Sequence, residues 1–172
     1  MIDYDLFKEI ELYSKRHVES SSSLYKYRGA SESKMFIQCL EGKVAEFSCY
    51  FSMVEAGYIL KNKPDLQIYS EQNKNHNADL ICIGKHREIY QHEKHIHVKS
   101  ISIKTLNSFG VSFLTQNNDP IFLNPDPNHF YSVMLKVSLS DYKFHKWICS
   151  TDVNWGAPKS PYLKSKVAAY IK

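Results

Sequence analysis

The order of periodic segments along this chain predicts an α+β fold, or a three-layer α/β fold, with helices flanking one mixed central β-sheet. Two segments with helical periodicity come first, segments with period two follow, and one more helix is expected at the end. The 172 residues suffice for one domain with its own core, and the sequence shows no repeat and no domain linker. We therefore expect a single domain, with a helical N-terminal extension over 1–30, a core over 31–104, and strands and a helix over 105–172.

Two amphipathic helices are predicted in the first third of the chain. Residues 2–17 carry one apolar stripe, and the run Ser20–Ser23 is expected to end this helix in a loop. Between residues 32 and 58 apolar side chains recur every three or four positions, which is typical of a helix with one buried face. Gly57 is the expected stop signal for this second helix.

The rest of the chain changes to period two and to β-branched residues. Six strands are predicted: Leu66–Tyr69, Ala78–Ile83, His95–Ile103, Val111–Thr115, Tyr131–Val137 and Lys146–Ser150. Turns or loops are expected at 73–77, 84–88, 117–120 and 124–128. Pro161 favours the start of a last helix that runs to Ile171, because proline suits an early helical position.

Composition limits the classes of protein to which the chain can belong. No apolar stretch approaches the length of a membrane span, and the first residues lack a signal-peptide pattern. Four cysteines occur without a CxxC pair, which indicates reduced thiols in a cytoplasmic protein. The formal net charge of +4 permits nucleic-acid binding without demanding it. We expect a cytoplasmic protein that does not bind membranes.

Two charged residues interrupt apolar strands. Because side chains alternate along a strand, Asp79 should leave one face of its strand with Ile81, and Lys99 should leave one face of its own strand with His97. If the two strands pair, a carboxylate and an ammonium can meet on the sheet. A charge near an apolar core is costly unless it is paired or binds a metal. The alternative is that both side chains merely face water.

Glu46 borders the buried stripe of the second predicted helix. Gly42, one turn earlier, costs helix stability by about 1 kcal/mol relative to alanine and is expected to mark close packing against another backbone. Glu46 is therefore expected to point toward the sheet where Asp79 emerges. A solvated glutamate beside the stripe explains the same residues equally well.

These residues together carry a resemblance to a known family. A helix with Gly42-Lys43-Val44-Ala45-Glu46, a strand with Asp79, and a strand ending in His97-Val98-Lys99 resembles the PD-(D/E)XK nuclease superfamily, whose fold is restriction-endonuclease-like. The chain departs from the family pattern where His97 replaces an Asp or Glu, and where Ala78 replaces a frequent proline. Pro64-Asp65 supplies a literal Pro-Asp pair, but it is expected to precede a strand.

The resemblance implies a metal-dependent endonuclease. It assigns Mg²⁺ (or Mn²⁺) to Glu46 and Asp79, with the backbone carbonyl of Val98 as a further ligand, and it gives Lys99 the role of orienting or activating the attacking water. His97 is expected to bond a phosphate or that water, which leaves a two-carboxylate site that Mg²⁺ tolerates because it keeps several waters.

The resemblance also implies partners. Double-stranded DNA would be the substrate, a homodimer would cut both strands, and the enzyme would be similar to a type II restriction endonuclease. Contacts to DNA are expected from Ser100, Lys104, Gln116 and Asn117.

Three alternatives remain open from the residues alone. The chain could be a nucleic-acid-binding module of the same fold that has lost cleavage, for which His97 is the motivating departure. It could also be a structural or interaction protein. A histidine-rich zinc site is the third alternative, although it lacks a cysteine at ligand spacing; its residues are His86, His92, His95 and His97.

Overall fold

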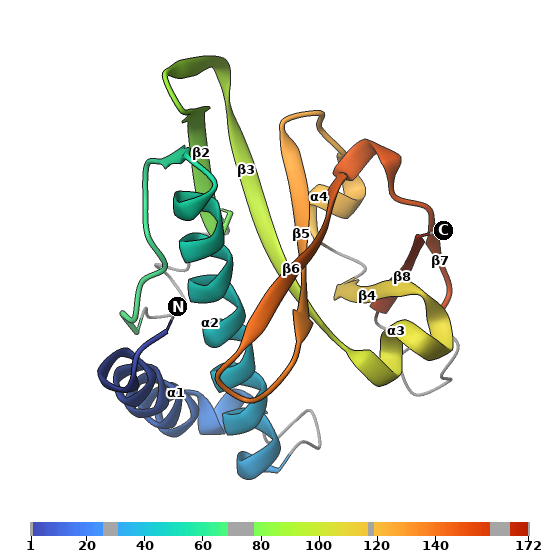
Figure 1. The fold of residues 1–172 in the computed structure, drawn as a ribbon. Coiled ribbons are helices and arrows are strands. Elements are labelled where there is room, and N and C mark those ends of the chain that lie inside the picture. Colours follow the sequence, from blue (N-terminus) through green and yellow to red (C-terminus); the bar gives the residue numbers. More distant parts are fainter. Residues whose placement is uncertain (1, 26–30, 69–77, 117–118, 159–165, 172) are drawn as a thin grey trace.

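Three layers make up the fold, and a five-stranded sheet is the middle one (Figure 1). The computed structural model describes residues 2–25, 31–68, 78–116, 119–158 and 166–171. The helical layer holds α1 (Tyr4–Tyr25) and α2 (Glu32–Glu55). The central sheet holds β1 (Tyr58–Leu60), β2 (Leu80–Lys85), β3 (Glu88–Ser102), β5 (His129–Lys136) and β6 (Tyr142–Cys149). The third layer is a small sheet of β4 (Val111–Gln116), β8 (Lys166–Ile171) and β7 (Trp155–Gly156).

The central sheet is mixed, with strand order β1-β2-β3-β5-β6. β2 and β3 form an antiparallel hairpin, whereas β5 runs parallel to β3, with His97 opposite Tyr131 and Lys99 opposite Val133. The crossover between these parallel strands contains α3 (Ile103–Phe109), β4 and α4 (Pro120–Leu123). A mixed central sheet with helices was predicted from the sequence, and this coarse prediction is confirmed.

Each face of the central sheet buries its own hydrophobic core. Between α2 and the sheet lie fully buried side chains such as Leu40, Val44 and Ile96. On the opposite face, Tyr131 and Val133 pack against the small sheet. The two cores share strands β3, β5 and β6, so the central sheet is the common wall of both layers.

The ends of α2 follow from local chemistry. Ser31 caps the helix, because its hydroxyl accepts a hydrogen bond from the backbone N–H of Lys34 at 3.3 Å. Beyond the last turn Gly57 adopts φ +82°, a left-handed conformation that suits glycine, and the chain then turns back into β1. The predicted stop at Gly57 is confirmed, but residues 58–60 form a strand that was not predicted.

The predicted loop at Ser20–Ser23 is wrong, because α1 continues through these serines to Tyr25. Serine in a helix can satisfy its own hydroxyl on the preceding turn. Ser14 donates to the Ile10 carbonyl at 2.8 Å, and Ser20 donates to the His17 carbonyl at 3.0 Å. A run of serines is therefore a weak helix breaker when the surrounding helix packs against a neighbour.

The predicted C-terminal helix is also wrong over 166–171, while its expected start at Pro161 lies outside the described residues. Residues 166–171 form strand β8, which pairs with β4 on one edge and β7 on the other. Ala168 and Ala169 are buried there, at 2% and 0% exposure. Pairing between β4 and β8 outweighs the helix propensity of alanine, because the tertiary context decides such short segments.

Other boundaries differ from the prediction in smaller ways. β3 already starts at Glu88, because the hairpin turn is tight and His86 takes φ 53° in it. The strand ends at Ser102, one residue before the predicted end at Ile103, and Ser102 is the N-cap of α3. Residues 66–68 form no strand, while Tyr69 and the predicted turn at 73–77 lie outside the described residues. The predicted loop at 124–128 is confirmed, and Pro120 starts α4.

Candidate active site

Asp79 lies immediately before β2, at a place where the hairpin opens. β2 begins with Leu80 opposite Ile96, so β3 continues from His97 onward without β2 as a neighbour. The Asp79 carboxylate occupies this opening and accepts a hydrogen bond from the backbone N–H of Val98 at 2.7 Å. The carboxylate therefore replaces the strand partner that Val98 would otherwise lack.

Asn62 holds the backbone around Asp79 from the other side. Its side-chain amide donates to the Asp79 carbonyl at 3.1 Å, and its carbonyl oxygen accepts from the Ile81 N–H at 2.6 Å. Both backbone groups lie at the start of β2. This two-sided bond sets the position from which the Asp79 side chain emerges.

Glu46 reaches the same region from α2. Its carboxylate is paired with Lys43, one turn earlier in the helix, at 2.7 Å, and the two side chains are only 16% and 19% exposed. Burial, the largest cause, and the charge of Asp79 together raise the pKa of Glu46 to about 7, although Lys43 opposes the shift. Glu46 thus titrates near neutrality because it is desolvated beside a second acid.

The charges of Asp79 and Lys99 also act on each other. Burial raises the pKa of Asp79, whereas the hydrogen bond from Val98 and the ammonium groups of Lys99 and Lys43 lower it. Lys43, Glu46, Asp79 and Lys99 are hereafter called the charged cluster. The cluster joins α2, the start of β2 and the middle of β3, from positions far apart in the sequence.

Lys99 enters the charged cluster from the face of the sheet opposite α2. Its ammonium lies 5.8 Å from the centre of the Tyr131 ring on β5, in the second core. Glu46 comes from the helix side instead. The opening at the start of β2 is what allows groups from both faces to act on one carboxylate.

His97 shares its strand face with Lys99, but it takes part in a different group of side chains. Its Nε2 lies 3.2 Å from Nδ1 of His129, and His95 stacks on His129 with ring centroids 4.7 Å apart. Burial lowers the pKa of His97 to about 3, and the neighbouring charges of His129 and Lys99 act in the same direction. The imidazole is therefore neutral at physiological pH and can offer a hydrogen bond or a lone pair, but not a positive charge.

Asp119, at the start of α4, is a charged neighbour that the sequence analysis did not single out. Its carboxylate accepts from the Thr115 hydroxyl at 2.6 Å and from the Ile121 N–H at 2.9 Å. Burial alone would raise its pKa, but these hydrogen bonds and the charge of Lys99 lower it. Asp119 is therefore ionised, and it is a second carboxylate that interacts with the charge of Lys99.

The donor set of the charged cluster fits a hard divalent cation. Two largely buried carboxylates, of which Asp79 raises the pKa of Glu46, would be stabilised by a positive charge between them, and oxygen ligands suit Mg²⁺ or Mn²⁺. Among the described residues, no three His, Cys, Asp or Glu side chains converge closely enough to hold a metal by themselves. A cation would therefore bind through two carboxylates and backbone or water oxygens.

The histidines considered for zinc do not assemble. His86 lies in the β2–β3 turn, whereas His92 is exposed within β3. His95 and His97 stack against His129 with nearly parallel rings instead of surrounding one point. Within the described part of the chain, these side chains form no zinc site.

The remaining predicted site residues are dispersed. Ser100 on β3 and Lys104 on α3 are exposed. The Gln116 side chain and all of Asn117 lie outside what the structure describes. Asp65 is close enough to raise the pKa of Glu46, although burial and Asp79 raise it more.

Sequence reasoning missed Lys43, Asn62 and Asp119. Lys43 could have been found, because its spacing of three from Glu46 places both side chains on one helix face. Asn62 and Asp119 act through contacts that depend on loop conformation, and no sequence pattern signals those contacts.

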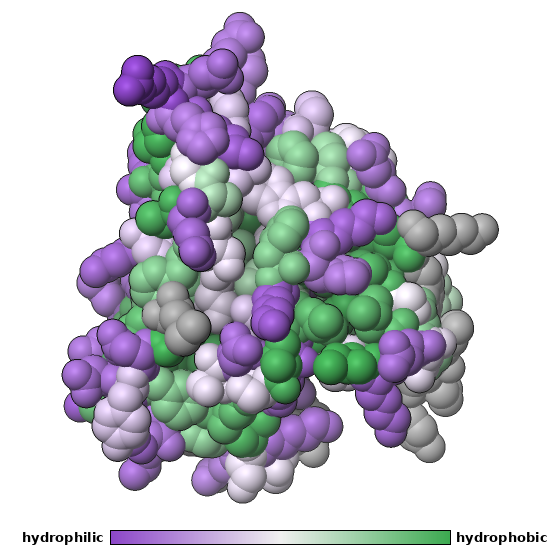
Figure 2. All heavy atoms as spheres, in the orientation of Figure 1, coloured by the Kyte–Doolittle hydropathy of each residue, from purple (hydrophilic) through white to green (hydrophobic). Residues whose placement is uncertain are grey.

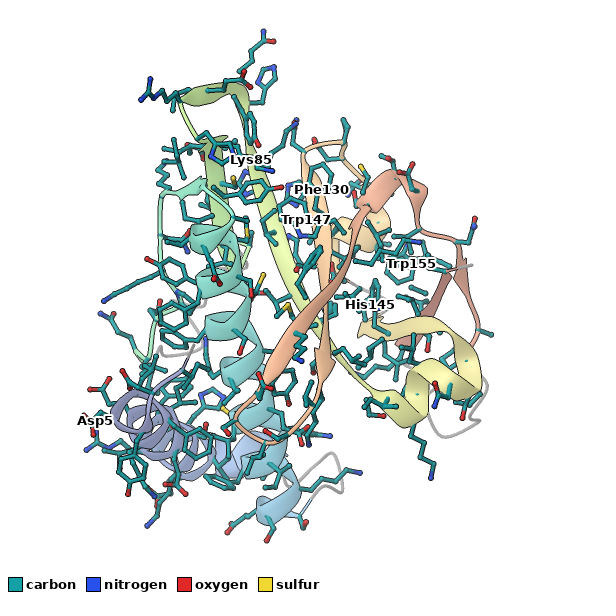
Figure 3. The ribbon with its side chains drawn as sticks, in the orientation of Figure 1. Asp5, Lys85, Phe130, His145, Trp147 and Trp155 are labelled. Atoms are coloured by element: carbon teal, nitrogen blue, oxygen red, sulfur yellow. The ribbon has the colours of Figure 1, made fainter. Side chains whose placement is uncertain are left out.

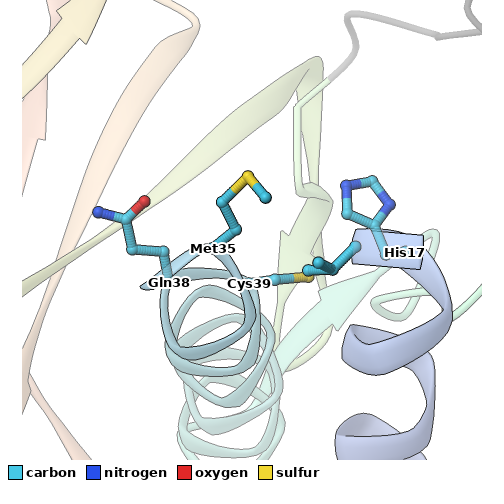
Figure 4. Close-up of a pocket in the computed structure, with 5 residues that line it drawn as sticks. His17, Met35, Gln38 and Cys39 are labelled. Atoms are coloured by element: carbon cyan, nitrogen blue, oxygen red, sulfur yellow. The ribbon is translucent and has the colours of Figure 1, made fainter. Parts of the chain in front are cut away.

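A hollow of about 250 Å³ lies away from the charged cluster, between α1 and α2 (Figure 4). It is lined by His17, Val18, Met35, Gln38 and Cys39. Burial raises the pKa of the Cys39 thiol, so this cysteine stays protonated and is a poor nucleophile at neutral pH.

None of the helices in the described residues is long and apolar enough to cross a membrane. Comparison of the chain with protein-family models found no match, and neither did comparison with curated proteins or with solved structures.

Proposed function

We propose that this protein is a metal-dependent DNA endonuclease that hydrolyses phosphodiester bonds. The observation that carries the proposal is the charged cluster, in which Asp79 interacts electrostatically both with Glu46 of α2 and with Lys99 of β3. Two largely buried acids beside two ammonium groups are costly for a purely structural role. Perturbed carboxylates of this kind are typical of functional sites.

The arrangement of elements supports the resemblance to the PD-(D/E)XK superfamily and its restriction-endonuclease-like fold. The chain runs from a helix with Glu46 through a strand preceded by Asp79 to an antiparallel strand with Lys99. This is the order of elements on which the resemblance rests. The His97 departure leaves two acidic ligands, and the Val98 carbonyl can add a third oxygen, because N–H and C=O of one strand residue point to the same edge.

The residues of the cluster can divide the chemistry between them. A bound divalent cation supplies neutralisation of phosphate charge and a lowered pKa of water. Glu46 and Asp79 would hold it once both are ionised. Lys99 would place its ammonium against the negative charge that develops on the phosphoryl oxygens. Lys43 keeps Glu46 oriented, and the bonds of Asn62 keep Asp79 at the opening.

We further propose duplex DNA as the substrate and a homodimer as the form that cuts both strands, since one site cuts one strand. The excess of basic residues supports an anionic partner. Free thiols at all four cysteines support a cytoplasmic location. Ser100 and Lys104, both exposed, are the described residues proposed to contact DNA.

Plasmid cleavage tests the proposal. Purified protein should nick or linearise plasmid DNA with Mg²⁺ or Mn²⁺, and Asp79→Ala, Glu46→Gln and Lys99→Ala should each reduce the rate by at least about a hundredfold. Glu55→Gln, an exposed glutamate on the same helix, is the matched control and should cut normally. Equal cleavage by the wild type and Asp79→Ala, with folding intact, contradicts the proposal.

A second candidate function is a nucleic-acid-binding module of the same fold that does not cleave. The observation that favours it is His97, whose neutral imidazole is engaged with His129 at the position where the family carries an acid. Calorimetry separates the two candidates. The binding module would be supported if the protein binds DNA, does not cleave it, and shows no heat of binding when Mn²⁺ is added.

A further inference from the structure

A β-bulge in the edge strand β6 places two aromatic side chains on the same face of the sheet. Lys146 is opposite Val133 and Phe144 is opposite Met134, which leaves His145 as an extra residue in β6. In a regular strand Phe144 and Trp147, three residues apart, would point to opposite faces. The bulge turns both toward α2, and bulges at sheet edges commonly redirect side chains in this way.

These aromatic residues border a hollow of about 230 Å³ at the C-terminal end of α2. Its lining comes from four elements and the residue that follows α2: Ser52, Met53, Ala56, Tyr58, Lys85, Phe144 and Trp147. These residues are hereafter called the aromatic hollow. Figure 3 shows Lys85, Phe130 and Trp147 gathered between this end of α2 and β6.

Two aromatic rings of the aromatic hollow contact Trp147, and one of them, Phe144, remains open to solvent. Tyr58 stacks on Trp147 at 5.3 Å with 25° between the planes, and Phe144 meets Trp147 edge-on at 6.2 Å. The Phe144 side chain nevertheless remains 47% exposed. An exposed ring beside a hollow already walled by two others leaves room for one more planar group to stack.

Charge identifies the kind of planar group. Of the described residues that line the aromatic hollow, only Lys85 is charged, and its ammonium lies 4.6 Å from the centre of the Tyr58 ring. Lys94 lies 5.8 Å from the neighbouring Phe130 ring. Aromatic faces beside ammonium groups match a flat ring that carries a negative group. A nucleotide has this chemistry, because its base stacks and its phosphate pairs with lysine.

We propose that the aromatic hollow binds one nucleotide of a single-stranded nucleic-acid segment. The base would stack against Phe144 and Trp147, and the phosphate would pair with Lys85. The aromatic hollow shares no residue with the charged cluster, and it lies on the α2 face of the sheet, whereas Lys99 lies on the other. Binding there does not require phosphodiester cleavage.

Fluorescence anisotropy of a labelled oligothymidylate about ten nucleotides long tests this proposal, since single-strand sites cover several nucleotides. Phe144→Ala and Lys85→Glu should each weaken binding about tenfold or more, because stacking and phosphate pairing are lost. Ile103→Ala removes an equally exposed apolar side chain (49%) elsewhere, and Lys34→Glu reverses an exposed charge at the other end of α2. Both controls should bind as the wild type does.

Tryptophan fluorescence places the bound base. The chain has two tryptophans, so Trp155→Phe leaves Trp147 as the only reporter. Oligothymidylate should quench this signal, and adding Phe144→Ala should remove the quenching. Circular dichroism verifies that each variant is folded before it is scored.

The outcomes separate this inference from the endonuclease proposal. Asp79→Ala should keep the quenching while it loses cleavage. Quenching without cleavage by the wild type leaves the aromatic hollow standing and removes the endonuclease. Unchanged affinity in Phe144→Ala and Lys85→Glu, or an equal loss in Ile103→Ala and Lys34→Glu, overturns the aromatic hollow whatever the cleavage result.

Discussion

The ionisation of Glu46 links the site to the stability of the protein. Its pKa is raised by burial to about 7, above the value in the unfolded chain, so the folded state binds more protons between these two values. The contribution of Glu46 to the free energy of unfolding is therefore greatest at low pH, and it falls as the pH rises toward neutrality. Asp79, whose pKa burial also raises, acts in the same direction.

We predict that Glu46→Gln flattens this dependence. The variant should gain melting temperature relative to the wild type at about pH 8, and little or nothing at about pH 5, because only the ionised acid destabilises the fold. Thermal melts at both pH values measure this, with Glu55→Gln as the exposed control on the same helix. A gain that is equal at both pH values would mean that Glu46 ionisation is not the cause.

Asn62 is predicted to matter for both stability and site geometry. Asn62→Ala removes the bonds to the Asp79 carbonyl and the Ile81 N–H and leaves these groups without that partner. The free energy of unfolding should fall by about 1–3 kcal/mol, which is typical of partly buried groups left unsatisfied. Urea denaturation measures the loss, and Asn124→Ala in the exposed loop after α4 should change the midpoint little.

At the scale of elements, one glycine within α2 and another just beyond its end have opposite roles. The expectation that Gly42 marks close packing is wrong, because a Cβ built there meets no atom within 4 Å. At Gly57, just beyond the helix, a Cβ would lie 2.3 Å from Nδ1 of His86, and φ is +82°. The N–H of His86 also bonds to the Gly57 carbonyl at 2.6 Å, so the β2–β3 turn fits against this glycine.

We therefore predict opposite results for the same substitution at the two positions. Gly42→Ala should raise the free energy of unfolding by about 1 kcal/mol, because alanine is the better helix former and has room. Gly57→Ala should lower it, because alanine is strained at positive φ and crowds His86. Chemical denaturation of both variants tests this pair. Loss of stability in Gly42→Ala would indicate a neighbour at that position.

The surface of the elements is uneven in polarity. Ile103 and Phe109 of α3 and Leu114 of β4 are exposed apolar side chains, and Figure 2 shows apolar surface in that part of the molecule. The edge strand β6 differs, since its exposed residues 143–146 include two lysines. Lysines and a bulge on an edge strand disfavour pairing with a second copy of that edge.

At the scale of the whole molecule, the shared central sheet should make both cores unfold together. Trp147 packs against the core under α2, and Trp155 packs against the core under the small sheet. Single-tryptophan variants should therefore report one common denaturation midpoint, and Leu40→Ala should shift it for both reporters, at a cost of about 2–5 kcal/mol. Different midpoints for the two tryptophans would show that the layers are independent.

The amount that could be predicted from the sequence depended on how local each interaction is. The long apolar stripe located α2, and alternating residues located β3, β4 and β5, because burial of one face leaves a periodic mark. The serine run and the Ala168-Ala169 segment misled, since their state depends on what packs or pairs with them. β1 was hidden for the same reason, because it is a strand of three residues whose backbone pairs with β2 at the edge of the sheet.

The sequence by itself determined the residue types of the candidate site, including the charged interruptions at Asp79 and Lys99 and the glutamate beside an apolar stripe. Only the tertiary structure decided that these groups act on one another, because that requires β3 to continue beyond the start of β2 and α2 to cross the opening. It also decided that His97 stacks with His129 and that a bulge aligns Phe144 with Trp147. Such contacts join segments distant in the chain, and their energy comes from packing and desolvation that no local pattern records.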